Sequence, residues 1–168
     1  RSALSKFREL NDSVNISWTM NEIGNVYFDK GIADSSIIYL TGAYRLRESL
    51  GSTKGMVNTA INLGLVYAQF NQDYEKALEY FEIGYEGQKA ENDSVGMANA
   101  INNKALCYQH TDRFDESLPL LKEALQIWED IGSKGGQAMT LNNLGDVYRE
   151  TKKYDLAIEY FDRSLTIC

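Results

Sequence analysis

Apolar and small residues recur along this chain at a spacing of about 40 positions. The clearest copy runs from Leu141 to Tyr148 and continues from Tyr154 to Phe161. Four tyrosines, at positions 27, 67, 108 and 148, mark the copies at steps of 40, 41 and 40 residues. A repeat of this length is typical of solenoids, in which each unit packs mainly against its neighbours. The periodicity therefore predicts an array of similar units.

Each repeat divides into two helices, and the second carries small and large residues at steps of three, four and three. These steps place the residues on one helix face. Small residues at two turns let a neighbouring helix approach closely, and the large residue fills the remaining space. We assign this face as Ile32, Ser35, Tyr39, Gly42; Tyr74, Ala77, Phe81, Gly84; Phe114, Ser117, Leu121, Ala124; and Tyr154, Ala157, Phe161, Ser164.

The first helix of each repeat has a small residue three positions before its tyrosine: Gly24, Gly64, Ala105 and Gly145. A glycine inside a helix costs about 1 kcal/mol relative to alanine, so we expect close helix contact to offset this cost. Lys104 stands where the other copies are apolar. Either its side chain extends to solvent along the helix surface, or this helix is slightly rotated.

The links between repeats are also periodic: Asn11-Asp12, Gly51-Ser52, Asn92-Asp93 and Gly132-Ser133. Gly or Asn can take the left-handed conformation that ends a helix, and Ser or Asp can cap the next helix with a side-chain oxygen. The predicted organisation is one array: residues 1–12 as the second helix of a truncated repeat, then repeats at 13–51, 52–92, 93–132 and, incomplete, 133–168.

The start of the sequence matches the second helix of a later repeat: Ala3, Leu4, Phe7 and Leu10 align with Ala124, Leu125, Trp128 and Ile131. The last residue, Cys168, also aligns with Trp128, partway along a second helix. We therefore expect a fragment of a longer array. The apolar residues Ile158, Phe161 and Leu165 would lack a covering repeat. Exposed apolar faces attract partners, so we also expect end-to-end self-association.

Composition excludes several classes of protein. Hydrophobic residues make up 43% of the 168 residues, enough to bury a core, and the formal net charge is −7. The negative charge argues against a nucleic-acid partner, and no apolar run is long enough for membrane insertion. The two cysteines show neither a disulfide framework nor metal-ligand spacing, so we expect no metal and no cofactor. We favour the cytoplasm, with the periplasm as the alternative if the chain belongs to a sensor kinase.

The helix slots resemble those of the tetratricopeptide repeat, in a 40-residue variant similar to Leu-Gly-Asn-type scaffolds, kinesin light chains and bacterial sensor or regulator proteins. The resemblance implies an all-α, right-handed superhelix of about four helical hairpins plus a preceding helix. It also implies a non-catalytic scaffold that holds a partner protein or an extended peptide in a concave groove. The alternative is a sensor or regulatory region of a histidine kinase or cyclase, or a peptide-sensing regulator.

The resemblance places the groove on the first helices, where polar residues recur. An Asn amide both donates and accepts hydrogen bonds, so stacked asparagines could hold a peptide backbone. The alternative is that these residues form an ordinary solvated face. His110, the one histidine, sits at a predicted helix end and does not indicate catalysis. The candidate binding residues are Asn21, Asn25, Asn58, Asn99, Asn102, Gln109, Asn142, Asp146 and Arg149.

Overall fold

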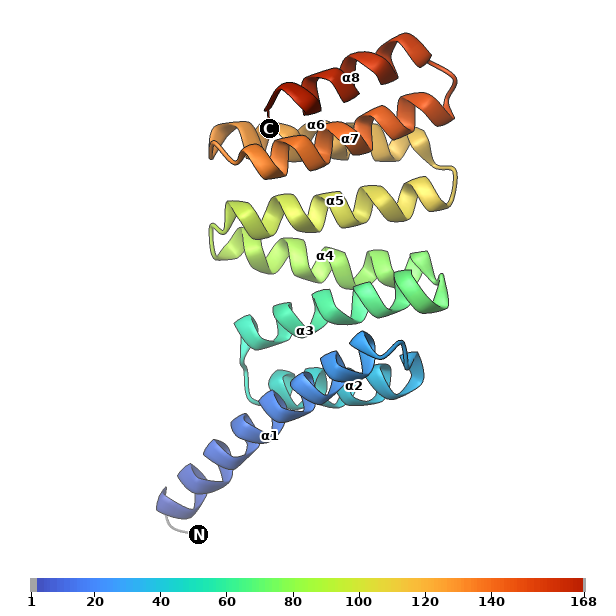
Figure 1. The fold of residues 1–168 in the computed structure, drawn as a ribbon. Helices are drawn as coiled ribbons and strands as arrows, with labels where there is room; N and C mark the ends of the chain where they lie inside the picture. The colour runs from blue at the N-terminus through green and yellow to red at the C-terminus, as the bar shows by residue number, and fades with distance from the viewer. Residues whose placement is uncertain (1–2, 168) are drawn as a thin grey trace. The chain divides into compact units, whose positions relative to one another are not determined.

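The computed structural model describes the backbone of residues 3–167 and the side chains of residues 12–167, and this part of the chain is helical with short turns (Figure 1). It divides into two compact units, Arg1–Ile83 and Gly84–Cys168. The predicted all-α fold of helical hairpins is confirmed. The side chains of Ala3, Leu4, Phe7 and Leu10, and Cys168, lie outside the described residues.

The first unit contains α1 (Ala3–Asp29), α2 (Ala33–Ser49), α3 (Thr53–Val66), the π-helical turn η1 (Tyr67–Asn71) and the first part of α4 (Tyr74–Ala90). Helix α2 packs along both α1 and α3. The core of this unit consists of Leu40, Leu63 and Val66, each fully buried, with aromatic side chains around them.

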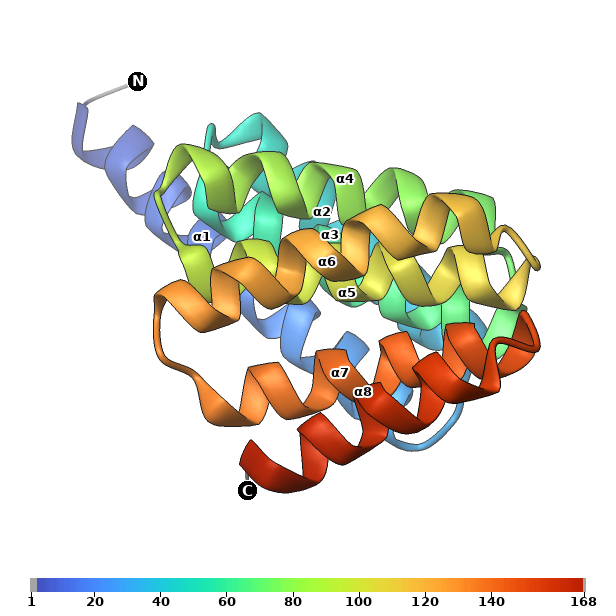
Figure 2. The ribbon, with the colours of Figure 1, turned by 90° about the horizontal axis from the view of Figure 1, so that it is seen from above.

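The second unit contains the rest of α4, then α5 (Ser94–His110), α6 (Phe114–Asp130), α7 (Lys134–Glu150) and α8 (Tyr154–Ile167). Helices α5 and α6 form one antiparallel pair and α7 and α8 another (Figure 2). One core cluster joins α5, α6, α7 and α8 through residues such as Ala105, Leu121, Leu144 and Ala157. A second cluster lies around Ile101 and Trp128.

Three of the four predicted links end helices as expected. Gly51, Asn92 and Gly132 have φ values of 64°, 55° and 69°, the left-handed conformation that closes a helix. The Asp93 carboxylate accepts a hydrogen bond from the Gly96 N–H, and the Ser133 hydroxyl accepts one from Gly136. At Ser52 the structure differs from the prediction, because this residue directly precedes α3 but its side chain forms no capping hydrogen bond.

The fourth predicted link, Asn11-Asp12, is not a helix end. Helix α1 continues through it without interruption from Ala3 to Asp29. Asn and Asp favour caps and turns, but they are tolerated inside a helix when no competing turn forms. The break expected at residue 12 is therefore absent, and the first hairpin consists of one long helix and α2.

The buried face of α2 is shifted by one residue from the predicted one. Ser36, Leu40 and Ala43 are fully buried, whereas Ile32 is 44% exposed. The face is therefore Ala33, Ser36, Leu40 and Ala43, in place of Ile32, Ser35, Tyr39 and Gly42. The prediction was wrong because neighbouring apolar residues fit the same three-four-three spacing in either register.

The second repeat contains one extra residue between its two helices. The step from Tyr67 to the start of α4 at Tyr74 is seven residues, whereas the step from Tyr108 to Phe114 is six. The structure accommodates the additional residue in the π-helical turn Tyr67–Asn71, which ends at Gln72 with a φ of 52°. Single π-type turns of this kind absorb an insertion without breaking the helix pair.

Close contact at the first-helix glycines is confirmed. A Cβ added at Gly64 would lie 2.7 Å from the Phe81 ring, and one at Gly145 would lie 2.6 Å from the Phe161 ring. At Gly24 the neighbouring side chain is Leu40, at 2.6 Å. These distances are shorter than any normal carbon contact, so the two helices of a hairpin approach closely only because the glycine has no side chain.

A second set of glycines receives long side chains from the preceding hairpin. Arg47 lies against Gly55, Gln88 against Gly96, and Trp128 against Gly136, in each case eight residues apart. The three long side chains are buried. Trp128 is therefore a packing residue, and this type of contact joins one hairpin to the first helix of the next.

Lys104 lies over an aromatic ring. It is half-buried on α5, and its Nζ is 5.3 Å from the centroid of the Tyr85 ring. A cation over the face of a tyrosine is attracted by the ring electrons. The side chain therefore extends along the surface of α4, which agrees with the first of the two interpretations of Lys104.

We expect Gly145→Ala to lower the free energy of unfolding by about 1–3 kcal/mol, because the added methyl group would force the Phe161 ring from its place. Gly135→Ala in the same helix is the matched control, since nothing lies within 4 Å of a Cβ there. It should raise stability by up to about 1 kcal/mol through helix propensity. Urea unfolding of both variants measures the difference, and equal effects would contradict the contact.

Candidate binding site

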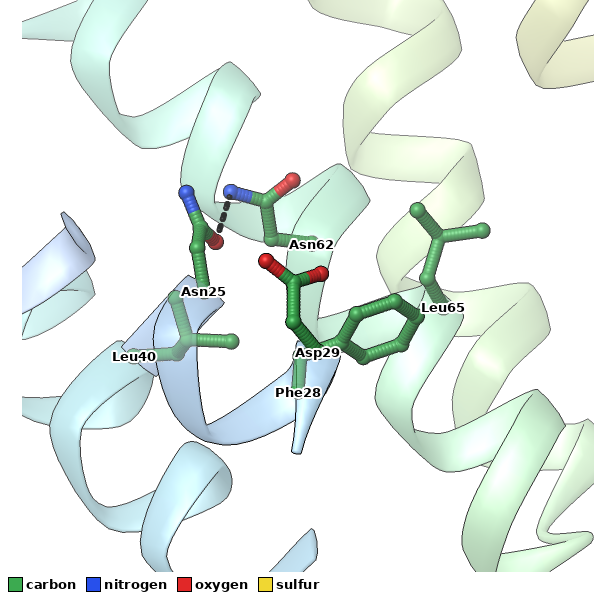
Figure 3. A pocket seen from close by; sticks show the side chains of 6 residues that line it. All are labelled: Asn25, Phe28, Asp29, Leu40, Asn62 and Leu65. Carbon is green, nitrogen blue, oxygen red and sulfur yellow. Dashed lines mark hydrogen bonds between the residues drawn. The ribbon is translucent and has the colours of Figure 1, made fainter. Parts of the chain in front are cut away.

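A pocket of about 260 Å³ opens between α1 and α3 in the first unit (Figure 3). Two amides and a carboxylate give it polar groups, and an aromatic ring and two leucines give it apolar walls. This combination, a mostly apolar hollow with a few placed polar groups, is typical of ligand sites. The lining residues are Asn25, Phe28, Asp29, Leu40, Asn62 and Leu65.

The two amides are held together by one hydrogen bond. The Asn62 Nδ2 donates to the Asn25 Oδ1 at 2.9 Å, which orients both side chains across the gap between α1 and α3 (Figure 3). The bond uses one donor and one acceptor. The Asn25 amide nitrogen and the Asn62 amide oxygen remain for a ligand, because an amide can form more than one hydrogen bond.

Asp29 is the charged group of the pocket. Figure 3 shows its carboxylate on the same side as the two amides. The side chain is exposed at the end of α1, and no ion pair to it is found among residues 12–167. The pocket therefore presents a negative charge that no cation of the described residues neutralises.

The Phe28 wall is supported from the π-helical turn. The Phe28 and Phe70 rings meet edge to face, with centroids 5.3 Å apart. Phe70 lies inside the turn Tyr67–Asn71, so a residue of the π-helical turn contacts the aromatic wall of the pocket. Such aromatic pairs are favourable beyond simple burial, and the contact fixes the position of Phe28.

The nine predicted binding residues fall into three groups in the structure. Asn58, Asn99, Asn142 and Arg149 are exposed, and Asn25, Gln109 and Asp146 are partly exposed. Asn21 and Asn102 differ, because they are 6% and 2% exposed. Only Asn25 of the nine lies in the pocket. Of the six asparagines in the expected ladder, two are therefore not open to a partner.

Asn21 is part of a buried network in the first unit. Its Oδ1 accepts a hydrogen bond from the Arg47 guanidinium at 3.3 Å and lies 3.1 Å from the Thr59 hydroxyl. Arg47 also donates to the Gly55 carbonyl at 2.9 Å. Burial lowers the pKa of Arg47, while the nearby Glu22 acts in the opposite direction. Asn21 thus joins α1 to α2 and α3 instead of facing a partner.

Asn102 forms the equivalent bond in the second unit. Its Nδ2 lies 3.0 Å from the Thr140 hydroxyl, and its Oδ1 is 3.5 Å from the Asn143 amide nitrogen. Asn21 pairs with Thr59 and Asn102 with Thr140, at the same separation of 38 residues. The same two slots therefore link consecutive first helices, and a buried amide that is paired in this way has no open surface.

The charged residues near the end of α7 pair with each other. Arg149 Nη1 lies 3.0 Å from the Asp146 Oδ1, and Nη2 lies 3.0 Å from the Glu150 Oε1. All three side chains are more than 40% exposed. Exposed ion pairs contribute little to stability, so these groups can exchange partners with a ligand at low cost.

Gln109 donates to the Ser117 hydroxyl at 3.3 Å.

Five pocket residues are absent from the predicted set: Phe28, Asp29, Leu40, Asn62 and Leu65. Phe28 lies four residues after Gly24, the position at which Gln109 and Arg149 were chosen in later repeats, and Asp29 is the next residue. The signal was therefore present in the repeat alignment. It was missed because Phe28 reads as a core residue and Asp29 as an ordinary charge at a helix end.

The described residues show no arrangement of three or more His, Cys, Asp or Glu side chains suited to a metal ion. Among the same residues, no helix is both long enough and apolar enough to cross a membrane. Cys107 is buried in α5.

A sequence profile of the tetratricopeptide repeat matches residues 15–90 and 96–168. The chain belongs to the tetratricopeptide-repeat family. Comparison with curated protein sequences gives no match.

Solved structures support the fold of this tetratricopeptide-repeat chain. The apo form of RapI is similar over 98% of this chain and 60% of RapI, with a TM-score of 0.84 and 24% identity. A Rap protein complexed with Competence and Sporulation Factor matches over 95% of this chain and 43% of its own length (TM-score 0.78, 19% identity). The repeats of a Podosopora anserina putative kinesin light chain match over 90% and 74% (TM-score 0.76, 16% identity). The chain thus spans 60% or less of both Rap proteins.

We expect Asn102→Ala to lower the free energy of unfolding by about 1–3 kcal/mol, because the Thr140 hydroxyl would lose its partner in a buried site. Asn142→Ala is the matched control: it changes the same slot of the next repeat, where the side chain is exposed. Its effect should stay within about 0.5 kcal/mol. Thermal and urea unfolding test this contrast, and an equal loss in both variants would refute the linking role of Asn102.

Proposed function

We propose that this chain is a non-catalytic binding module that holds an extended segment of a partner protein. The pocket between α1 and α3 is the observation that carries this proposal. It provides a hollow for one side chain and, beside it, amide groups that can bond to a peptide backbone. Tetratricopeptide-repeat helices supply a rigid frame for such a site, because each hairpin is fixed by its neighbours.

The pocket is suited to a basic side chain. The apolar walls formed by Phe28 and Leu65 can contact the methylene stem of a lysine or arginine. The Asp29 carboxylate can then receive the charged group, and the Phe28 ring can add a cation–π contact. The net charge of −7 acts in the same direction, since it favours the approach of a positively charged partner.

The exposed members of the predicted set remain our proposed contacts for the rest of the segment. Asn58 belongs to the first unit, and Asn99, Asn142, Asp146 and Arg149 belong to the second. Amides can bond to the backbone of a peptide without selecting its sequence. Asp146 and Arg149 can bind charged side chains of the partner after releasing each other.

A second candidate is a sensor or regulatory region of a larger protein. It is supported by the similarity to RapI and to the Rap protein complexed with Competence and Sporulation Factor. In that case the segment held by the pocket would be a signal, and its binding would change the behaviour of neighbouring domains. Both candidates use the same pocket, and they differ in what binding controls.

We expect a blocked pentapeptide Gly-Gly-Lys-Gly-Gly to shift the amide NMR signals of Asn25, Asp29 and Asn62, because its ammonium group can reach the carboxylate. The same peptide with norleucine or glutamate in place of lysine should shift them much less. Asp29→Asn should weaken lysine-peptide binding by roughly fivefold, the equivalent of about 1 kcal/mol for a partly exposed charge pair.

Asp162→Asn is the control for this titration, because Asp162 is an exposed carboxylate on α8 in the other unit. It removes the same charge from the chain and should leave the affinity unchanged. If Asp29→Asn and Asp162→Asn have equal effects, or if the norleucine peptide binds as well as the lysine peptide, the pocket does not recognise a basic side chain.

A further inference from the structure

Trp18 on α1 is open to solvent and takes no part in the pocket described above. Its side chain is 61% exposed, and no stacking or cation contact to its ring is found among residues 12–167. Proteins usually bury most of the surface of a tryptophan. Where tryptophan is exposed, it is also one of the residues that contribute most to binding partners.

The position of Trp18 is open in every repeat. It lies six residues before the small residue of the first helix, and its equivalents are Asn58, Asn99 and Met139. The two asparagines are exposed, and Met139 is 42% exposed. Each of these three follows a complete hairpin of the described chain. The exposure of Trp18 therefore depends on the helix face that carries it, and not on the place of α1 in the array.

Trp18 lies on the face of α1 that also carries the pocket residues Asn25 and Asp29. The separations from Trp18 are seven and eleven residues, which correspond to about two and three helical turns. Glu22, four residues after Trp18, belongs to the same stripe. At a rise of about 1.5 Å per residue, the stripe from Trp18 to Asp29 is about 17 Å long. The pocket is thus one end of a longer open surface.

This stripe carries two carboxylates and no cation. Glu22 is exposed, and its Oε1 accepts a hydrogen bond from the Asn21 amide at 3.0 Å. No ion pair to Glu22 or Asp29 is found among residues 12–167. The Arg47 guanidinium interacts with Glu22 electrostatically, but it is buried and bonded to Asn21 and the Gly55 carbonyl. The Glu22 carboxylate is therefore held in place and can accept further hydrogen bonds from a partner.

An indole ring one helical turn from a carboxylate is suited to a guanidinium group. The planar guanidinium of arginine stacks on an aromatic face, and its N–H groups can donate to a carboxylate at the same time. We propose that Trp18 and Glu22 form a second subsite, which takes an arginine of the segment whose other basic side chain enters the pocket at Asp29. This proposal rests on the proposed function, because one segment occupies both subsites.

The geometry of α1 sets the spacing of the two basic residues. The point midway between Trp18 and Glu22 lies about 13 Å from Asp29 along the helix. An extended peptide rises about 3.3 Å per residue, and its side chains alternate between two sides. Two residues four positions apart therefore point the same way and are also about 13 Å apart. The expected partner segment has arginine and lysine separated by three residues.

Blocked peptides test this spacing. We expect Gly-Gly-Lys-Gly-Gly-Gly-Arg-Gly-Gly, or the same peptide with lysine and arginine exchanged, to bind about fivefold more tightly than its norleucine-for-arginine counterpart. It should also shift the indole N–H NMR signal of Trp18. Moving the arginine one residue towards the lysine should remove the gain, because the two side chains then point to opposite sides.

Trp18→Ala and Glu22→Gln should each remove most of the gain from arginine and leave the affinity for Gly-Gly-Lys-Gly-Gly nearly unchanged. The matched controls are Met139→Ala, at the same position in the second unit, and Glu159→Gln, an exposed carboxylate of α8. Both controls should retain the gain. Circular dichroism confirms that each variant is folded.

The outcomes separate this proposal from the proposed function. If the lysine peptide binds at the pocket but arginine adds nothing, or if the controls lose as much as Trp18→Ala, the second subsite is overturned alone. If the lysine peptide does not bind, the pocket hypothesis fails. In that case an indole shift of Trp18 by Gly-Gly-Arg-Gly-Gly that Glu22→Gln abolishes would support the arginine subsite by itself, and the absence of a shift would overturn it.

Discussion

The contact between a first-helix glycine and a bulky second-helix side chain is the constraint on which each hairpin depends. Phe81 lies on Gly64 and Phe161 on Gly145, at distances that exclude even a methyl group on the glycine. Because the helix axes come this close, the small residues one turn away, such as Ala77 and Ala157, are buried as well. Glycine lowers the stability of a helix. Because glycine has no side chain, the two helices can pack closely, and this packing offsets the loss.

A polar side chain has a different role in this fold according to whether another helix lies beside it. Asn102 and Asn142 occupy the same slot, yet Asn102 bonds to Thr140 inside the second unit and Asn142 faces solvent. A buried amide must be paired, because its desolvation is costly. An exposed one is free to bind something else. The same residue type therefore links two hairpins in one repeat and faces solvent in another.

The irregular turn of the second repeat lies beside the candidate pocket of the first unit. The π-helical turn Tyr67–Asn71 absorbs the extra residue and places Phe70 against Phe28. Phe28 in turn forms a wall of the pocket that also contains Asp29 and the Asn25–Asn62 pair. The irregular step in the array and the pocket with mixed chemistry are thus parts of one local structure.

The sequence by itself determined the repeat, its two helices, the close contact at Gly24, Gly64 and Gly145, and the links at Gly51, Asn92 and Gly132. All of these follow from local rules of spacing, side-chain size and backbone conformation. Only the tertiary structure decided the register of α2, the continuity of α1 through Asn11, and the burial of Asn21 and Asn102. These three features depend on which neighbouring helix each side chain packs against. When two helix registers fit the same spacing of apolar residues, the sequence does not show which of them faces that neighbour.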